Sequence, residues 1–309
     1  MIFLRRVLLL SGAQALAVWA MAIAPDPGAI AFGTEKYVEY DAGDLPLVIT
    51  TPHGGRLRPE SLPNRVDGVT GSDLDTLELA RAIAGEFATR TGHRVHLVAS
   101  HLHRSKLDPN REITEAAQGN AAAERAWREY HAFITAATAA AAAQHGFAFL
   151  IDLHGHGHPI PRIELGYTLN EDQLGQSDAA FDASGLIARS TLRDLHARLG
   201  GSAAQLLRGP GSLGDLFAAR GLRAVPSPEE PAPGENPFFA GAYTIKFHAA
   251  EPTTTKVDGV QVETYRQGLR DTAENRARFA TVVAEVFTIF LHERYQYDFP
   301  TANSTTANK

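Results

Sequence analysis

The sequence predicts an α/β protein in which a mostly parallel central sheet carries helices on both faces. Short apolar runs rich in β-branched residues alternate along the chain with long helix-forming stretches. Alternation of this kind is typical of buried parallel strands that are joined by helices. The length of 309 residues and the hydrophobic content of 44% suit one large domain or two small ones, and no repeat of fixed period is present.

The same patterns predict the individual elements. The runs that predict strands are Leu47–Thr51, Val95–Ala99, Phe147–Leu153, Ile163–Thr168 and Val260–Thr264. The stretches that predict helices are Asp73–Thr91, Asn120–His145, Ser184–Leu199, Leu213–Arg220 and Thr272–Tyr295. The proline-rich segment 226–237 predicts a loop that covers a site. Active sites of such folds lie at the carboxyl ends of the strands, which directs attention to the residues found there.

The sequence patterns at both ends of the chain predict segments that lie outside the domain. Residues 1–31 begin with a pair of arginines, continue with an apolar stretch, and end in small residues at cleavage-like spacing. This pattern predicts an export signal and a periplasmic or secreted protein, with a membrane anchor as the alternative. A single α/β domain is then expected over residues 32–298, and a disordered tail over 299–309.

Composition narrows the range of partners. The net charge of −6 does not favour nucleic acid or an anionic membrane, and no membrane contact is expected once the signal is removed. The chain contains no cysteine. Disulfides and thiolate ligands are therefore excluded, and a transition metal would have to be held by nitrogen and oxygen. The oligomeric state stays open.

Two histidines follow predicted strands. His53, in VITTPHGG, comes two residues after the strand Leu47–Thr51, beside a proline and two glycines that permit a tight turn. His154, in FLIDLHGHGH, directly follows the strand Phe147–Leu153. Both side chains are expected to project from one edge of the sheet, which favours a metal site. For His53 alone, a histidine that only caps a turn is an equal alternative.

The remaining polar residues of the histidine-rich segment predict a supporting role. Asp152 and His154 share one face of an extended chain, and a carboxylate commonly fixes the second ring nitrogen of a histidine ligand. The glycines between the histidines indicate that the strand ends nearby. His156 and His158 are therefore expected to line the pocket or face solvent and not to bind the metal.

Two further motifs contain candidate catalytic groups. In KLDPNRE, Arg111 offers a planar donor pair for a carboxylate or an oxyanion, and Asn110 could bind a substrate amide or carboxylate. In VDGVQVETYRQGLRD, the alternation of an extended chain places Glu263 on the same face as Gln261. There Glu263 would suit a general base beside a metal-activated water. Solvated surface positions are the alternatives for both Arg111 and Glu263.

Taken in order, the motifs resemble the N-formylglutamate amidohydrolase family, which is related to zinc carboxypeptidases and to the aspartoacylase and succinylglutamate desuccinylase group. The family pattern runs Pro-His-x-Gly, an aspartate that opens a helix, Asp-x-Asn-Arg, Asp-x-His, a Gly-Gly-x-x-Thr-Arg-His-like segment and Gln-x-Glu. The matching segments are Pro52–Gly55, Asp73, Asp108–Arg111, Asp152–His154, Gly241–Tyr243 and Gln261–Glu263. The resemblance extends over roughly Leu47 to Leu291 and implies a zinc carboxypeptidase-like fold.

The resemblance also implies a ligand set and roles. One catalytic zinc ion would be held by His53, Asp73 and His154, with a fourth position left for water. Glu263 would act as catalytic base, assisted by Arg111. Asp75 and, more weakly, Glu60 are alternatives to Asp73. The residues expected to contact the substrate are Asn110, Arg111, Tyr243, Lys246, His248 and His156. The family's Gly-Gly and Thr-Arg-His are replaced here by Gly241-Ala242 and Ile245-Lys246-Phe247, which leaves the substrate open.

These expectations describe an exported zinc-dependent amidohydrolase. It would cleave the C–N amide bond of an N-formyl or N-acyl amino acid, or of a small peptide-like substrate that bears a carboxylate. Manganese, iron or cobalt would also tolerate this ligand set. One alternative is a carboxypeptidase-like or cell-wall amidase specificity on the same scaffold. Another is a non-catalytic periplasmic zinc-binding protein that uses the His-Gly-His-Gly-His run.

Overall fold

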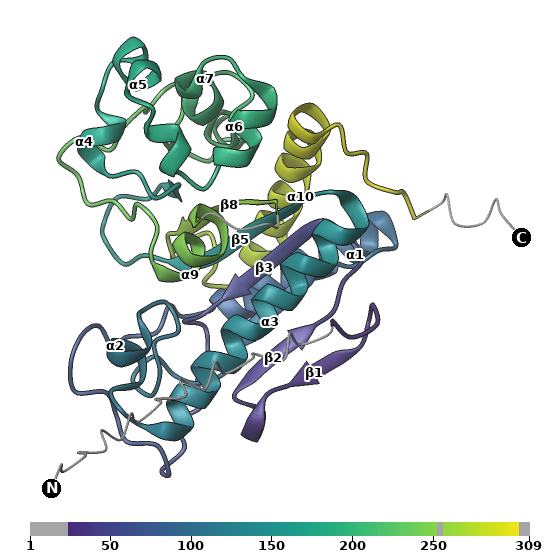
Figure 1. Cartoon of the computed structure of the whole chain (residues 1–309), viewed down its shortest axis with the longest axis vertical. Helices are drawn as coiled ribbons and strands as arrows, with labels where there is room; N and C mark the ends of the chain where they lie inside the picture. The colour runs from purple at the N-terminus through teal and green to yellow at the C-terminus, as the bar shows by residue number, and fades with distance from the viewer. Residues whose placement is uncertain (1–23, 252–255, 303–309) are drawn as a thin grey trace, which may run out of the picture.

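The computed structural model describes residues 24–251 and 256–302 and has an eight-stranded mixed sheet at its centre (Figure 1). The strands are β1 (Ile30–Phe32), β2 (Val38–Asp41), β3 (Leu47–Thr51), β4 (His96–Ser100), β5 (Ala148–Gly155), β6 (Ile163–Gly166), β7 (Ala224–Val225) and β8 (Val257–Thr264). Their order is β1-β2-β4-β3-β5-β8-β6-β7. The four central strands β4, β3, β5 and β8 are parallel, whereas β1, β2 and β6 join by antiparallel pairing.

Helices cover both faces of this sheet, as predicted. The long helices are α1 (Thr76–Thr91), α3 (Ala121–His145) and α10 (Ala273–Tyr295). One core packs α1 and α10 against one face through residues such as Ile49, Ile151 and Val260. A second core packs α3 against the other face through Val48 and Leu150. Figure 1 shows α3 crossing in front of β3 and α1 behind it. The mostly parallel α/β architecture is therefore confirmed.

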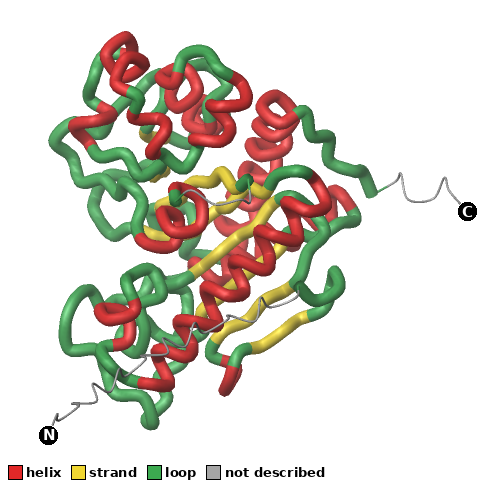
Figure 2. Tube along the Cα trace, viewed as in Figure 1, coloured by secondary structure: helices red, strands yellow, loops and turns green. Residues whose placement is uncertain are grey.

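Shorter helices complete the fold. They are α2 (Ile113–Ala117), α4 (Glu171–Leu174), α5 (Asp178–Ser184), α6 (Arg193–Leu199), α7 (Ala203–Arg208), α8 (Leu213–Ala218) and α9 (Tyr243–Ile245). The 3₁₀ turns η1 (Thr34–Lys36) and η2 (Leu186–Arg189) and the π-helical turn η3 (Lys246–Ala250) accompany them. Figure 2 shows the short helices α4–α7, labelled in Figure 1, gathered at the end of the molecule away from β1 and β2.

The predicted helix over residues 184–199 is wrong in its first half. The chain there forms η2 and then a bend and a turn over residues 190–192 before α6 begins at Arg193. Thr191 explains the break, because its backbone nitrogen donates to Tyr167 and its backbone oxygen accepts from the Gly259 nitrogen at 2.9 Å. Its hydroxyl also donates to the Gly259 carbonyl at 2.7 Å. These contacts with distant segments replace the helical hydrogen bonds that the local sequence favours.

Ordered structure extends slightly beyond both predicted ends of the domain. Residues 1–23 of the predicted export signal and 303–309 of the predicted tail lie outside the described residues. The predicted boundary at residue 31 falls inside β1, which pairs with β2. At the other end, the Phe299 ring lies 5.5 Å from the Phe87 ring, so packed chain continues past residue 298. Within the described ranges, no helix is both long and apolar enough to cross a bilayer.

A buried carboxyl at the start of β8 makes stability depend on pH. Burial raises the pKa of Asp258 from 3.8 to about 6, although Leu195 N and Tyr295 OH donate to it at 3.0 and 2.9 Å. A raised pKa means that the folded state holds its proton longer than the unfolded state. The free energy of unfolding therefore falls as pH rises from about 4 to about 6, by about 3 kcal/mol from this group.

Asp258→Asn should remove this part of the pH dependence, because asparagine stays neutral and keeps an acceptor for Leu195. Urea unfolding of both proteins at about pH 4 and about pH 7 checks it. On going from about pH 4 to about pH 7, the free energy of unfolding of wild type should fall by up to about 3 kcal/mol more than that of the variant. Parallel pH profiles for the two proteins would contradict the assignment.

Candidate active site

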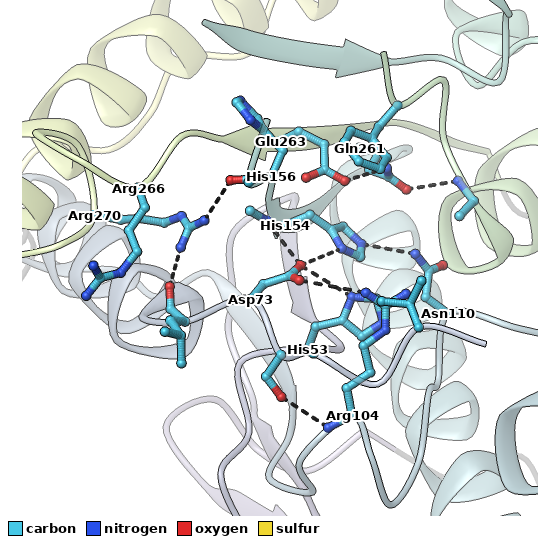
Figure 3. A pocket seen from close by; sticks show the side chains of 18 of the residues that line it. His53, Asp73, Arg104, Asn110, His154, His156, Gln261, Glu263, Arg266 and Arg270 are labelled. Atoms are coloured by element: carbon cyan, nitrogen blue, oxygen red, sulfur yellow. Dashed lines mark hydrogen bonds and ion pairs between the residues drawn. The ribbon is translucent and has the colours of Figure 1, made fainter. Parts of the chain in front are cut away.

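Three predicted metal ligands meet at the carboxyl edge of the central strands. His53 lies two residues beyond β3, His154 lies in β5, and Asp73 lies in the turn before α1. The Asp73 Oδ2 atom is 3.3 Å from His53 Nδ1 and 3.3 Å from His154 Nδ1. One ligand atom from each residue lies within 4.8 Å of the others, so the group could hold a metal ion. Figure 3 shows the Asp73 carboxylate facing both imidazoles, with an interaction drawn to each.

The local chain around Asp73 explains its position. The sequence predicts that Asp73 opens a helix, but α1 begins only at Thr76. The Thr76 hydroxyl donates to the Asp73 carbonyl at 2.8 Å, and Asp75 between them takes the left-handed conformation with φ 69°. This turn directs the Asp73 carboxylate toward the sheet edge, where the Gly155 nitrogen donates to Oδ2 at 3.1 Å.

The other ring nitrogen of each histidine lies against a buried carboxylate. His53 Nε2 lies 2.7 Å from Asp108 Oδ1, and His154 Nε2 lies 3.0 Å from Asp152 Oδ2. The Thr50 hydroxyl donates to Asp152 at 2.7 Å and holds that carboxylate in place. Both imidazoles therefore have Nε2 occupied and Nδ1 directed at Asp73. Carboxylates that orient histidine ligands in this way are a regular feature of metal sites.

Removing either orienting carboxylate should weaken metal binding. Asp108→Asn and Asp152→Asn are each expected to reduce the affinity for zinc about 10- to 100-fold, because the imidazole loses the partner that fixes its tautomer and direction. Competition with a chromophoric chelator measures this affinity. Asp75→Asn is the matched control, since Asp75 pairs with Arg56 and Arg266 and contacts neither histidine. Equal affinities for all three variants would show that these carboxylates do not orient the ligands.

Spacing and charge at this position fit a divalent cation. A tetrahedral ion with ligand bonds of about 2.0–2.1 Å separates its ligand atoms by about 3.3–3.4 Å. The two 3.3 Å separations at Asp73 match this value. Although burial opposes it, Asp152 and Asp73 raise the pKa of His154 well above its ordinary value. The surroundings therefore stabilise positive charge, and two imidazoles with one carboxylate are the donor set of many catalytic zinc sites.

Glu263 lies beside this group on the neighbouring strand. In the parallel β5–β8 pair, His154 is opposite Glu263 and Asp152 is opposite Gln261, so these side chains share one face of the sheet. Burial raises the pKa of Glu263 to about 8, with Asp73 and Glu164 acting in the same direction and His154 opposing. Gln261 Nε2 donates to Glu263 Oε1 at 3.1 Å while its amide oxygen accepts from Ala242 N at 2.9 Å. The carboxyl is therefore held in a fixed position.

The ligand group and Glu263 open into a single cavity of about 440 Å³. Four arginines, Arg104, Arg111, Arg266 and Arg270, line it together with Asn110 and His156. Arg111 is half-buried and pairs with the exposed Glu115 at 3.3 Å. Its guanidinium is therefore free to exchange this partner for a substrate anion.

Asn110 is engaged within the protein more fully than the sequence suggested. Its Oδ1 atom accepts from Thr244 N at 2.7 Å, and its Nδ2 atom lies 3.2 Å from His154 Nε2. The neighbouring Pro109 carbonyl accepts from His131 Nε2 at 3.0 Å. The turn that contains Asp108 and Asn110 is thus tied to both histidine ligands. The amide of Asn110 supports the site in addition to lining the cavity.

The structure does not bring all predicted substrate contacts to this cavity. Tyr243, Lys246 and His248 are not among its lining residues. Tyr243 packs against Trp127, with ring centroids 5.6 Å apart, and Lys246 lines a separate cavity. His248 is buried, with Nε2 at 2.9 Å from His131 Nδ1. The glycine-rich motif that suggested these positions departs most from the family pattern, and it forms a separate short helical turn here.

The alternatives for the acidic ligand lie elsewhere. Asp75 forms ion pairs with Arg56 and Arg266, each at 3.0 Å, and Glu60 is exposed. The proline-rich segment 226–237 does not line the cavity in the part of the chain described, so it does not form the expected covering loop. Phe239, just beyond that segment, does line it.

Three residues that support the candidate site received no role from the sequence. Asp108 belongs to a motif that was singled out for its asparagine and arginine, so a signal was present but pointed to other residues. Gln261 belongs to the Gln-x-Glu motif, where only the glutamate received a role. Arg270 lies in the same segment VDGVQVETYRQGLRD and received no role. It is buried and donates to the carbonyls of Leu74, Thr264 and His156.

Comparison of the sequence with protein-family models and with curated proteins gives no match. Solved structures do match. One is a gene product of Agrobacterium tumefaciens, with TM-score 0.49 and 16% identity over 85% of this chain and 97% of that chain. Another is N-formylglutamate amidohydrolase from Ralstonia eutropha JMP134, with TM-score 0.48 and 16% identity over 89% of this chain and 98% of that chain.

A third similar structure is the zinc-free form of a protein named YNDL, with TM-score 0.36 and 16% identity over 88% of this chain and 93% of that chain. One of these structures carries the name of the family whose motifs the sequence resembles. The roles of individual residues rest on the contacts described above.

Proposed function

We propose that this protein is a metal-dependent hydrolase of C–N amide bonds that acts on N-formyl or N-acyl amino acids or on small peptide-like substrates. One observation carries the proposal. A buried glutamate, Glu263, shares a cavity with two oriented histidines and an aspartate whose spacing suits a zinc ion. A metal site next to a carboxyl that can exchange protons is suited to hydrolysis, and the motif resemblance directs the proposal to amide bonds.

The ligands for one zinc ion would be His53 Nδ1, His154 Nδ1 and the Asp73 carboxylate. When bound there, zinc supplies a Lewis acid for the scissile carbonyl and promotes ionisation of a water molecule. Asp108 and Asp152 keep the two Nδ1 atoms directed toward the ion through their contacts with Nε2.

Glu263 would move the proton in the reaction. The water oxygen attacks the carbonyl carbon while a Glu263 oxygen takes the water proton. The same carboxyl then gives a proton to the amine nitrogen as the C–N bond breaks, so that an acid and an amine leave. A carboxyl whose pKa burial raises above its ordinary value suits a group that must both accept and return a proton. Gln261 holds the carboxyl in position throughout.

Arg111 is proposed to bind the carboxylate of the substrate. It lies at the cavity on a half-exposed side chain, and its present partner Glu115 is itself half-exposed. Arg104 is less available, because its Nε already donates to Asp108 at 2.8 Å. Export to the periplasm or the medium, guided by the N-terminal signal that the sequence predicts, completes the proposal.

The zinc-storage alternative fits the site less well. It requires the His-Gly-His-Gly-His run to bind several ions. Among residues 24–251 and 256–302, a single group of histidine and acidic side chains has the spacing of a metal site, and it contains only His154 of that run. His156 Nε2 donates to the Arg162 carbonyl and His158 Nε2 lies 2.9 Å from Glu164, so both are already engaged.

A substrate screen tests the proposal. Zinc-loaded protein is assayed with N-formyl amino acids, longer N-acyl amino acids, dipeptides and cell-wall peptides, and released amine is measured. Hydrolysis of the N-acyl amino acids is expected, and removal of metal with a chelator should abolish it until zinc is restored. Preference for dipeptides or cell-wall peptides would favour the carboxypeptidase-like or amidase alternative. Turnover that survives complete metal removal would overturn the proposal.

A further inference from the structure

Two histidines that the proposed chemistry does not use form part of a ring stack beside the cavity. His156 and His158 stack with ring centroids 3.8 Å apart and planes inclined by 10°. Phe239 continues the stack on His158, with centroids 6.3 Å apart and an angle of 13°. His156 and Phe239 both line the cavity that contains the ligand group and Glu263. The stack therefore forms one of the cavity walls.

A buried carboxylate fixes this wall from behind. Glu164 is fully buried and accepts from the Phe239 backbone nitrogen at 2.9 Å, while its other oxygen lies 2.9 Å from His158 Nε2. The fully buried Arg162 donates to Glu164 at 3.0 Å, and its own carbonyl accepts from His156 Nε2 at 2.9 Å. These contacts hold the two imidazoles and the backbone of Phe239 in place before any substrate binds.

Phe239 is exposed despite this support, and it is not alone. Val69, Leu74 and Phe239 are 57%, 50% and 44% exposed, and all three line the same cavity. Their backbones are pinned, since the Val69 carbonyl accepts from Arg65 at 2.8 Å and the Leu74 carbonyl accepts from Arg270. Exposed apolar side chains that gather at a cavity with a polar floor are typical of a site that receives an apolar group.

We propose that Val69, Leu74 and Phe239 form an apolar rim that binds a hydrocarbon group of the substrate and so determines specificity. The inference rests on the proposed function, since it concerns the same cavity. The preferred substrates would be N-acyl amino acids that carry an aliphatic or aromatic group. A small polar substrate such as an N-formylated acidic amino acid would leave the rim uncovered. The hydrocarbon group could belong to the acyl part or to the amino-acid side chain.

Two homologous series distinguish these sources. In one, N-formyl amino acids carry straight side chains lengthened from methyl to butyl; in the other, N-acyl glycines carry acyl chains lengthened in the same steps. Each methylene that enters the rim should raise kcat/KM about three- to fourfold. The series that shows this rise identifies the part of the substrate at the rim. Phe239→Ala should flatten the rise in that same series.

Matched variants keep the test specific. Phe32→Ala removes a phenylalanine of nearly the same exposure, 45% against 44%, that is not among the cavity lining. This control should keep the wild-type dependence on chain length. A wild-type enzyme that is indifferent to chain length in both series would overturn the inference. So would a Phe239→Ala variant that keeps the full rise.

A binding measurement separates this inference from the proposed function. Calorimetry follows the binding of straight-chain carboxylates from butyrate to octanoate to wild type and to Phe239→Ala. If affinity rises about three- to fourfold per methylene only in wild type while no amide is hydrolysed, the rim is supported and the proposed function fails. If amides are hydrolysed but neither affinity nor kcat/KM depends on chain length, the proposed function stands and the rim is refuted.

Discussion

Glu263→Gln is expected to bind zinc as tightly as wild type and to lose at least about 100-fold in kcat on the best N-acyl amino acid. Glutamine has nearly the same shape and keeps an amide oxygen that can accept from Gln261, so the cavity wall should stay in place. It cannot take a proton from water or return one to the amine. The loss should therefore appear in kcat with little change in KM.

Metal content and steady-state kinetics measured on the same preparation check this prediction. Glu60→Gln is a matched control, because it makes the same chemical change on an exposed side chain. The control should keep wild-type kcat. Normal turnover in Glu263→Gln would remove the proposed base, whereas loss of zinc together with turnover would give Glu263 a role in holding the ion.

His154→Ala and His156→Ala are expected to differ completely in metal content. His154 presents Nδ1 to Asp73 and has its Nε2 fixed by Asp152. Alanine at this position leaves only two ligands, which is too few for a stable zinc site. His156, two residues further along, donates to a backbone carbonyl and stacks on His158. Its removal should leave one zinc ion per chain.

Atomic absorption after dialysis against a weak chelator measures the zinc content of both variants. The comparison is sharp because the two histidines lie in the same short segment. Thermal unfolding of the metal-free proteins shows whether each variant is folded. Full occupancy in a folded His154→Ala protein would refute the ligand assignment, and loss of zinc from a folded His156→Ala protein would extend the site along the histidine run.

Much of the central sheet could be predicted from the sequence because its strands are buried on both faces. Such strands appear as continuous apolar runs, and Leu47–Thr51 matches β3 residue for residue. The edge strands β1, β2 and β7 were missed because they are only two to four residues long. The non-helical turn at Thr191 was missed because partners distant in sequence, Tyr167 and Gly259, hold it.

Site residues could be predicted from the sequence where the alternation along a strand fixes the face on which a side chain lies. His154 and Glu263 lie on adjacent parallel strands, and their alternation with apolar neighbours placed both side chains on one face. Asp108 could not be assigned in this way, because its carboxylate reaches His53 from a turn whose course depends on Thr244 and His131. Motif likeness alone suggested Tyr243, Lys246 and His248, and the chain carries them away from the cavity.

A crystal structure of the zinc-loaded protein, with anomalous scattering recorded at the zinc edge, tests the central claim most directly. The account predicts one strong peak, about 2.0–2.1 Å from His53 Nδ1 and His154 Nδ1, with an Asp73 oxygen as third ligand and Glu263 outside the ligand set. A peak at His156 and His158, or coordination through Nε2 of His53 or His154, would contradict it.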